Sequence, residues 1–317
     1  MPDLVTLVAV EAAHRRVGNR VHRTPTMSSR AIGSELGVEL WLKAELFQRT
    51  GSFKIRGVLN MLLSLTPDEL SHGVVTMSSG NHAAALAAGA GIVGTSATIV
   101  MPAHAVEFKV AATRRYGGNT VLTDRPLAEV MQEIATTEKR VVVHPFDDVR
   151  IVAGAAGVGL ELVDDAPELD LIVVPVGGGG LISGVATAVR LRSPRTRIVG
   201  VEPAGADAMT RALAAGAPQS ITPNTICDGL AAPFAGAVNL AHVKAFVDEV
   251  VTIEDSAVIP GLRLLYERAK LAAEPSAAAG LAALLSGAID VGDARRVGVV
   301  VSGGNVDLGR LAKLVTS

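Results

Sequence analysis

The chain has 317 residues, of which 49% are apolar, 3% aromatic and 19% charged. This length suggests one large domain or about two ordinary ones, and it allows a full core without disulfides. The 29 basic and 31 acidic side chains give a net charge of −2, so no basic footprint for nucleic acid is present. Cys227 is the only cysteine, which excludes an intramolecular disulfide and a Cys-based zinc site.

The first residues contain no basic region followed by a long apolar stretch. Elsewhere, Gly, Pro or charged residues interrupt each apolar run before it could span a bilayer. We therefore expect neither a signal peptide nor a membrane partner, and the cytoplasm is the expected location.

Short β-branched runs alternate with longer Ala/Leu-rich runs along the chain. We expect strands over 39–43, 73–77, 97–101, 120–123, 141–144, 171–176, 197–202, 246–253 and 297–301. Helices are expected over 81–91, 106–116, 127–138, 152–163 and 181–191. This alternation predicts βαβ units, and therefore an α/β fold with mostly parallel sheets covered by helices.

One lysine stands out, because Lys54 lies between Phe53 and Ile55 near the start of an expected helix. These neighbours would project to the sides, so the amine should lie at the edge of an apolar surface. Desolvation lowers the pKa of a lysine and leaves a useful fraction of neutral amine, which is the form that makes an imine with an aldehyde. Alone the pattern is weak, since most lysines are solvated.

Four consecutive glycines, Gly177–Gly180, separate an expected strand from an expected helix. Without Cβ atoms this backbone can aim several N–H groups at one point, and the helix N-terminus adds partial positive charge. The pattern favours a bound phosphate. It misses the dinucleotide fingerprint, because Ile182 and Ser183 stand where the third glycine is needed. Glu202 nevertheless keeps an NAD-dependent oxidoreductase open as an alternative.

A lysine together with a phosphate cradle suggests a phosphorylated aldehyde cofactor, and here four segments carry a resemblance. Residues 52–57, Ser-Phe-Lys-Ile-Arg-Gly, resemble the cofactor-lysine motif of fold type II pyridoxal-phosphate enzymes, in their serine/threonine dehydratase and serine racemase branch. Ser-Ser-Gly-Asn-His at 78–82, the glycines at 177–180 and Ser-Gly-Gly-Asn at 302–305 resemble three further family motifs in the expected order. The resemblance runs from about residue 24 to residue 307.

The resemblance implies a two-domain architecture similar to the β chain of tryptophan synthase, with pyridoxal 5'-phosphate in the cleft. Residues 1–66 and 148–317 would form a large cofactor-binding domain, and residues 67–147 a small domain that carries the substrate loop. It also implies a small-molecule amino-acid substrate and a homodimer.

The resemblance assigns roles to individual residues. Lys54 would bind the cofactor covalently and act as base at the substrate Cα, while Phe53 would pack against the ring. The cofactor would further be held by Asn81 at the ring hydroxyl, by Ser302 at the pyridine nitrogen, and by Gly177, Gly178, Gly179 and Gly180 at the phosphate. The loop of Ser78, Ser79, Asn81 and His82 would hold the substrate carboxylate through its N–H groups, although such residues are also ordinary helix caps.

Two serines bear on the type of reaction. A hydroxyl such as that of Ser302 leaves the pyridine nitrogen largely unprotonated, and this weaker electron sink suits loss of a β-substituent better than transamination. In racemases of the family, a serine at the place of Ser79 serves the opposite face of Cα as acid and base.

No metal is expected. Many relatives bind a divalent cation through a Glu-Pro-x-x-Ala-Asp-Asp segment, but here Glu202 is followed by Asp207 and then Ala208, so the final acid is missing. Asp207 more simply starts a helix. Glu274 lies either near the cofactor ring or in a helix-breaking turn, and Asp228 is a candidate for the pocket wall.

The function implied is a dehydratase, or ammonia-lyase, that converts L-threonine, L-serine or a related β-hydroxy amino acid to a 2-oxo acid and ammonia. A serine or other amino-acid racemase and a hydroxyaspartate dehydratase are the alternatives within the family. A non-catalytic binder that kept the fold is opposed by the intact Lys54.

Overall fold

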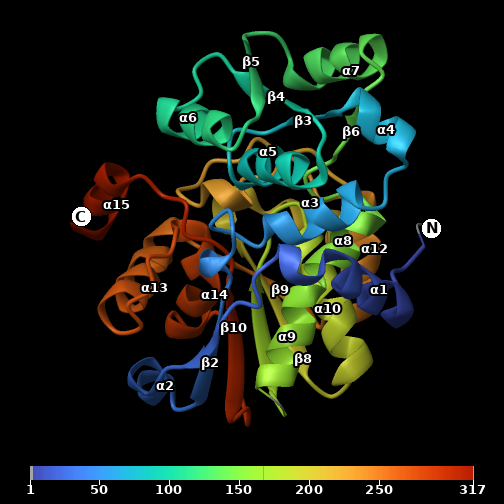
Figure 1. Ribbon diagram of the computed structural model, residues 1–317. Coiled ribbons are helices and arrows are strands. Elements are labelled where there is room, and N and C mark those ends of the chain that lie inside the picture. Colours follow the sequence, from blue (N-terminus) through green and yellow to red (C-terminus); the bar gives the residue numbers. More distant parts are fainter. Residues whose placement is uncertain (1–2, 167, 317) are drawn as a thin grey trace.

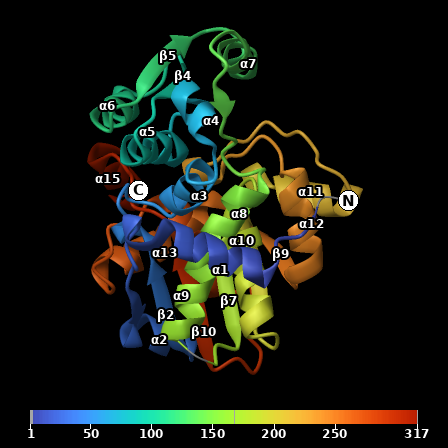
Figure 2. The ribbon, with the colours of Figure 1, turned by 45° about the vertical axis from the view of Figure 1, so that its right-hand side comes forward.

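The computed structural model describes residues 3–166 and 168–316, which form two sheets lying one above the other in both views (Figures 1 and 2). The six-stranded sheet has the order β1-β2-β10-β7-β8-β9, and the four-stranded sheet has the order β5-β4-β3-β6. All neighbouring strands are parallel except the pair β1 and β2. The expected α/β fold with mostly parallel sheets is confirmed.

The strands of the larger sheet are β1 (Thr26–Ser28), β2 (Glu39–Ala44), β7 (Leu171–Pro175), β8 (Arg197–Pro203), β9 (Glu249–Ile253) and β10 (Arg296–Val301). Those of the smaller sheet are β3 (Val74–Met77), β4 (Ala97–Pro102), β5 (Asn119–Thr123) and β6 (Val141–Val142). We call the part of the chain around the larger sheet the large unit and the part around the smaller sheet the small unit. The domain limits at residues 66/67 and 147/148 stay a prediction.

Helices cover both faces of each sheet. One face of the larger sheet packs against α2 (Arg30–Leu36), α13 (Asp255–Glu267), α14 (Pro275–Leu285) and α15 (Leu308–Thr316). Its other face packs against α9 (Gly157–Asp165), α10 (Gly180–Arg192), α11 (Ala208–Ala215) and α12 (Ala237–Phe246). The smaller sheet lies between α3 (Lys54–Leu62) with α5 (Asn81–Val93) and α7 (Leu127–Thr137). The remaining helices are α1 (Leu7–Val17), α4 (Pro67–His72), α6 (Glu107–Arg115) and α8 (Val149–Ala155).

Three expected elements differ from the structure. The helix expected over 152–163 is two helices, α8, which packs on α3 and α10, and α9, which packs on α10. A Cβ on Gly154 would lie 2.6 Å from the backbone oxygen of Arg56 in α3, and one on Gly159 would lie 2.8 Å from that of Val185 in α10. The strand expected over 246–253 begins only at Glu249, because α12 continues to Phe246, which packs in the core. The strand expected over 141–144 is shorter in the structure: β6 has only two residues, which are half-buried at the edge of the smaller sheet.

A buried ion network fixes the first turn of α3. The Arg56 guanidinium donates to Glu45 at 2.8 Å and to Glu161 at 2.7 Å. Lys43 forms an ion pair with Glu161 at 2.8 Å, and all four side chains are buried. Since these partners lie on or beside β2 and on α9, the network ties α3 to the large unit. None of the helices in the described ranges has the length and apolar character needed to cross a bilayer.

Candidate active site

A cavity of about 910 Å³ lies between the two units and is lined by residues of both. The carboxyl ends of several parallel strands meet there, which is where ligands bind in open α/β sheets. Gly177 and Ser302 follow β7 and β10 of the larger sheet, while Ser78 and His144 follow β3 and β6 of the smaller one. This volume suits a cofactor together with a small substrate.

The amine of Lys54 lies in the wall of this cavity. Lys54 is the first residue of α3, and its Nζ donates to the backbone oxygen of Pro145 at 2.9 Å. The same nitrogen lies 5.2 Å from the centre of the Phe53 ring. Desolvation by burial lowers the pKa of Lys54 to about 8, and the opposing charge of Glu274 offsets only part of this effect. The expected desolvated lysine is therefore present.

The glycine loop lies against the segment that holds the Lys54 amine. A Cβ on Gly178 would lie 2.5 Å from the ring of Phe146, the residue after Pro145. Gly179 has a φ of +96°, a conformation that favours glycine, and it caps the N-terminus of α10. Asn239 Nδ2 donates to the backbone oxygens of Gly178 at 2.8 Å and Phe146 at 3.1 Å.

Among the described residues, no side chain caps the N-terminus of α10, so its first N–H groups are available to a ligand. Helix N–H groups and the helix dipole together attract an anion. The loop and the lysine, in one cavity, therefore fit a phosphorylated aldehyde. Close packing against Phe146 also requires glycine at position 178.

Ser302 is buried at the end of β10 and lies beside the lysine segment. Its backbone oxygen accepts from the N–H of Phe53 at 3.1 Å, and the next residue, Gly303, forms a β-bridge with Ser52. Gly304 donates to the backbone oxygen of Gly51 at 2.9 Å. Residues 302–305 and 51–54 are thus held together, although they are far apart in sequence.

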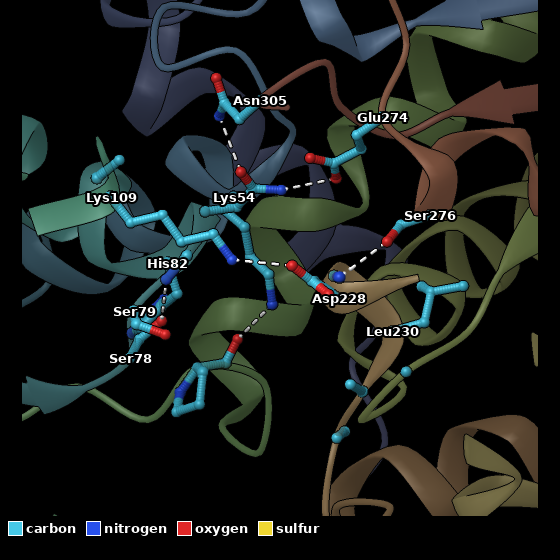
Figure 3. A pocket seen from close by; sticks show the side chains of 18 of the residues that line it. Lys54, Ser78, Ser79, His82, Lys109, Asp228, Leu230, Glu274, Ser276 and Asn305 are labelled. Carbon is cyan, nitrogen blue, oxygen red and sulfur yellow. Dashed lines mark hydrogen bonds and ion pairs between the residues drawn. The ribbon is translucent and has the colours of Figure 1, made fainter. Parts of the chain in front are cut away.

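The loop at residues 78–82 forms the wall on the small unit. In Figure 3, Ser78, Ser79 and His82 lie on one side of Lys54, and Asp228 and Ser276 on the other. The N–H of Ser78 donates to Val100 at 3.2 Å, so the N–H groups that remain for a carboxylate are further along the loop. His82 bonds through Nε2 to the backbone oxygen of Val143 at 3.1 Å, and burial, helped by the charge of Lys54, lowers its pKa to about 3. Its ring is therefore neutral.

Sequence reasoning left Glu274 undecided and did not single out the side chains of Asn305, Lys109 or Arg310. Asn81 donates to Glu274 at 2.8 Å and accepts from Asn305 at 2.8 Å. Burial raises the pKa of Glu274 to about 7, while the hydrogen bond from Asn81 opposes the rise. Glu274 and its neighbour Ser276 line the cavity at the start of α14.

Asp228 also lines the cavity, as the sequence suggested, and it connects the two units. It accepts from Lys109 of α6 at 3.0 Å and from Arg310 of α15 at 2.9 Å. The pair with Lys109 crosses the cavity in Figure 3. The sequence alone carried no signal for this pair, because residues 109 and 228 are 119 positions apart and neither belongs to a motif.

In residues 202–208, where many relatives bind a cation, the carboxylate of Glu202 is occupied by hydrogen bonds to a helix. Glu202 accepts from the N–H groups of Met209 and Thr210, each at 2.8 Å, and so caps α11. Asp207 precedes this helix but pairs with Arg211 at 2.7 Å. Within the described ranges, no group of three or more His, Cys, Asp or Glu side chains could hold a metal ion. The carboxylate of Glu202 is also buried, which does not suit the ribose contact of a nicotinamide cofactor.

Comparisons with known proteins agree with this geometry. Residues 17–303 match the family model described as "Pyridoxal-phosphate dependent enzyme". A serine racemase of Oryza sativa subsp. indica is 42% identical over 96% of this chain and 91% of its own length, and an L-threonine ammonia-lyase of Thermotoga maritima is 37% identical over 98% and 78%. The structure of maize serine racemase is similar with a TM-score of 0.94, at 40% identity, over 98% of this chain and 97% of the other.

These matches extend over both units and over the segments that meet at the cavity. They agree with the fold type II architecture and with a lysine and a phosphate cradle that face one space. The chain therefore belongs to the family of pyridoxal-phosphate-dependent enzymes.

Proposed function

We propose that this protein is a pyridoxal-phosphate-dependent ammonia-lyase that removes water and ammonia from L-threonine, L-serine or a related β-hydroxy amino acid. The observation that carries the proposal is the single cavity shared by Lys54, whose pKa is lowered to about 8, and by the loop Gly177–Gly180. The similarity to an L-threonine ammonia-lyase supports the reaction class. A cytoplasmic location and a homodimer stay predictions.

The cofactor would be held at four places. Lys54 would bind it covalently, the N–H groups of Gly177, Gly178, Gly179 and Gly180 would bind the phosphate, and Phe53 would pack on the ring. Asn81 would contact the ring oxygen, and Ser302 would face the ring nitrogen. When bound, pyridoxal phosphate supplies the electron sink for negative charge at the substrate Cα.

The chain itself would supply orientation and proton transfer. N–H groups of the loop that holds Ser78, Ser79, Asn81 and His82 would bind the substrate carboxylate, since α5 begins there and its dipole favours an anion. The amino group of the substrate would first displace Lys54 from the cofactor, and the freed neutral amine of Lys54 would then take the proton from Cα. The β-hydroxyl would leave as water with a proton that Lys54 returns, and one water molecule would hydrolyse the released enamine to a 2-oxo acid and ammonia.

Racemisation is the second candidate, and Ser79 is the observation that favours it. Ser79 lines the cavity and lies away from Lys54 in the close view (Figure 3). A hydroxyl there could return a proton to the face of Cα opposite the amine, which inverts the configuration. The similarity to serine racemases supports this activity beside dehydration.

The test uses the purified protein loaded with pyridoxal phosphate. We expect a visible absorption band that borohydride abolishes, and we expect Lys54→Ala to lack this band and all turnover. Lys244→Ala, which changes an exposed lysine outside the cavity, is the control.

Serine, threonine and 3-hydroxyaspartate of both configurations are then compared by release of 2-oxo acid and by deuterium exchange at Cα. Exchange with inversion but without oxo acid would make racemisation the main activity. No turnover of any of these amino acids would refute the ammonia-lyase.

A further inference from the structure

We propose that Asn305 and Glu274 are positioning residues that hold the side-chain amide of Asn81 with an N–H directed at the bound cofactor. The inference deepens the proposed function, because it rests on pyridoxal phosphate being bound beside Asn81. The question is whether the amide nitrogen or the amide oxygen of Asn81 faces the cofactor, and which residues determine this orientation.

A backbone carbonyl determines the orientation of the Asn305 side-chain amide. The oxygen of Thr50 can only accept, and it lies 2.7 Å from Nδ2 of Asn305, so the NH2 end of Asn305 must face it. Gly51 makes this approach possible, because its φ is +72° and a Cβ there would overlap the amide of Asn305. Asn305 therefore has a fixed donor end.

The donor end of Asn305 also determines the orientation of the Asn81 amide. The same Nδ2 of Asn305 lies 2.8 Å from Oδ1 of Asn81, and an NH2 group has two hydrogens to share between Thr50 and Asn81. Asn81 must then turn its oxygen toward Asn305. Its NH2 end faces Glu274, whose carboxylate accepts at 2.8 Å. The two contacts agree, since a carboxylate accepts and an amide nitrogen donates.

One N–H of Asn81 is left over. Glu274 takes one hydrogen of Nδ2, and within residues 3–166 and 168–316 the other has no protein partner. Asn81 lines the cavity, so this N–H is available to a ligand acceptor. A donor at this place stabilises an ionised ring oxygen, whereas an amide oxygen there would repel it. The arrangement therefore selects the ionised form of the cofactor.

The two partners are in contact, because the backbone of Asn305 is hydrogen-bonded to Glu274, but they respond differently to protonation. A protonated Glu274 could donate to an amide oxygen and so invert Asn81, and the charges that act on Glu274 include Lys54, Lys109 and Asp228. Asn305 opposes the inversion, because its NH2 end already holds the oxygen of Asn81. Asn305 should consequently matter more than the ionisation of Glu274.

The decisive variant is Asn305→Asp in the cofactor-loaded protein. It keeps the shape but replaces the donor by oxygen, which turns Asn81 around. We expect the pH midpoint of the visible band to rise by about one unit or more, and cofactor binding to weaken at least roughly 10-fold. Asn305→Ala removes the contact without repulsion and should weaken cofactor binding roughly 2- to 12-fold. Glu274→Gln should change the midpoint less than Asn305→Asp does.

Asn119→Asp makes the same chemical change at an exposed position on β5 and is the matched control. This inference alone would be overturned if both Asn305 variants fold by circular dichroism, have band midpoints within about 0.3 pH unit of wild type and bind the cofactor with dissociation constants within twofold of wild type. A wild-type protein without a borohydride-sensitive band would overturn the proposed function, and this inference with it.

Discussion

The amine of Lys54 is the group on which capture of the cofactor depends, and its lowered pKa makes that step sensitive to pH. With a pKa of about 8, roughly a tenth of this amine is neutral at pH 7, against about 0.03% for an ordinary lysine. Only the neutral form attacks an aldehyde. After the cofactor is removed, the rate of its rebinding should therefore rise between pH 6.5 and 8 and level off by about pH 9.

Stopped-flow absorbance of the visible band measures this rate. Glu274→Gln is the informative comparison, because the charge of Glu274 raises the pKa of Lys54, so its loss should move the profile to lower pH. A rate that still climbs about tenfold per pH unit between pH 9 and 10 would contradict a lowered pKa at Lys54.

At this scale the sequence draws attention to residues whose patterns are local, and the structure brings two such segments to one cavity. The short segments around Lys54 and Gly177–Gly180 carry their own signals, a lysine between apolar neighbours and a run without Cβ atoms. The partners of Asn81 could not be predicted in the same way, because Glu274 is 193 positions away and Asn305 is 224. Only the fold brings these three amide and carboxylate groups together.

At the scale of elements, the buried ion network below α3 should contribute strongly to stability. Replacing Arg56 by Met leaves Glu161 paired with Lys43, whereas buried Glu45 keeps no charged partner among the described residues, only the hydroxyl of Thr24. Removing one member of a buried pair costs about 3–5 kcal/mol in the free energy of unfolding. Urea denaturation at pH 7 measures this change.

The exposed pair of Arg125 and Glu133 provides the comparison, since removing it should cost at most about 1 kcal/mol. If Arg56→Met and Arg125→Met destabilise equally, the network does not hold α3 as described.

The start of α3, which this ion network fixes, could not be predicted from the hydrophobic periodicity of the sequence. For the same reason the sequence did not reveal the break between α8 and α9, which packing against α3 and α10 determines.

At the scale of the whole molecule, the cavity is bounded by two units that are joined across it by polar contacts. Lys109 of the small unit and Asp228 of the large unit form one of them, and both side chains are partly exposed. Such a pair contributes about 0–1 kcal/mol. Lys109→Met should therefore hardly change the free energy of unfolding, also because Asp228 keeps Arg310.

The same small energy is significant for opening and closing of the cavity. A change of up to about 1 kcal/mol shifts an equilibrium between open and closed forms about fivefold. If the substrate binds to the closed form, Lys109→Met should raise KM for the amino acid up to about fivefold and leave kcat nearly unchanged.

Lys109→Arg, which keeps the charge, is the matched control and should restore most of the affinity. Steady-state kinetics at low salt are the measurement, because salt screens exposed pairs. An unchanged KM in Lys109→Met, or an equal rise in Lys109→Arg, would show that this pair does not control closure.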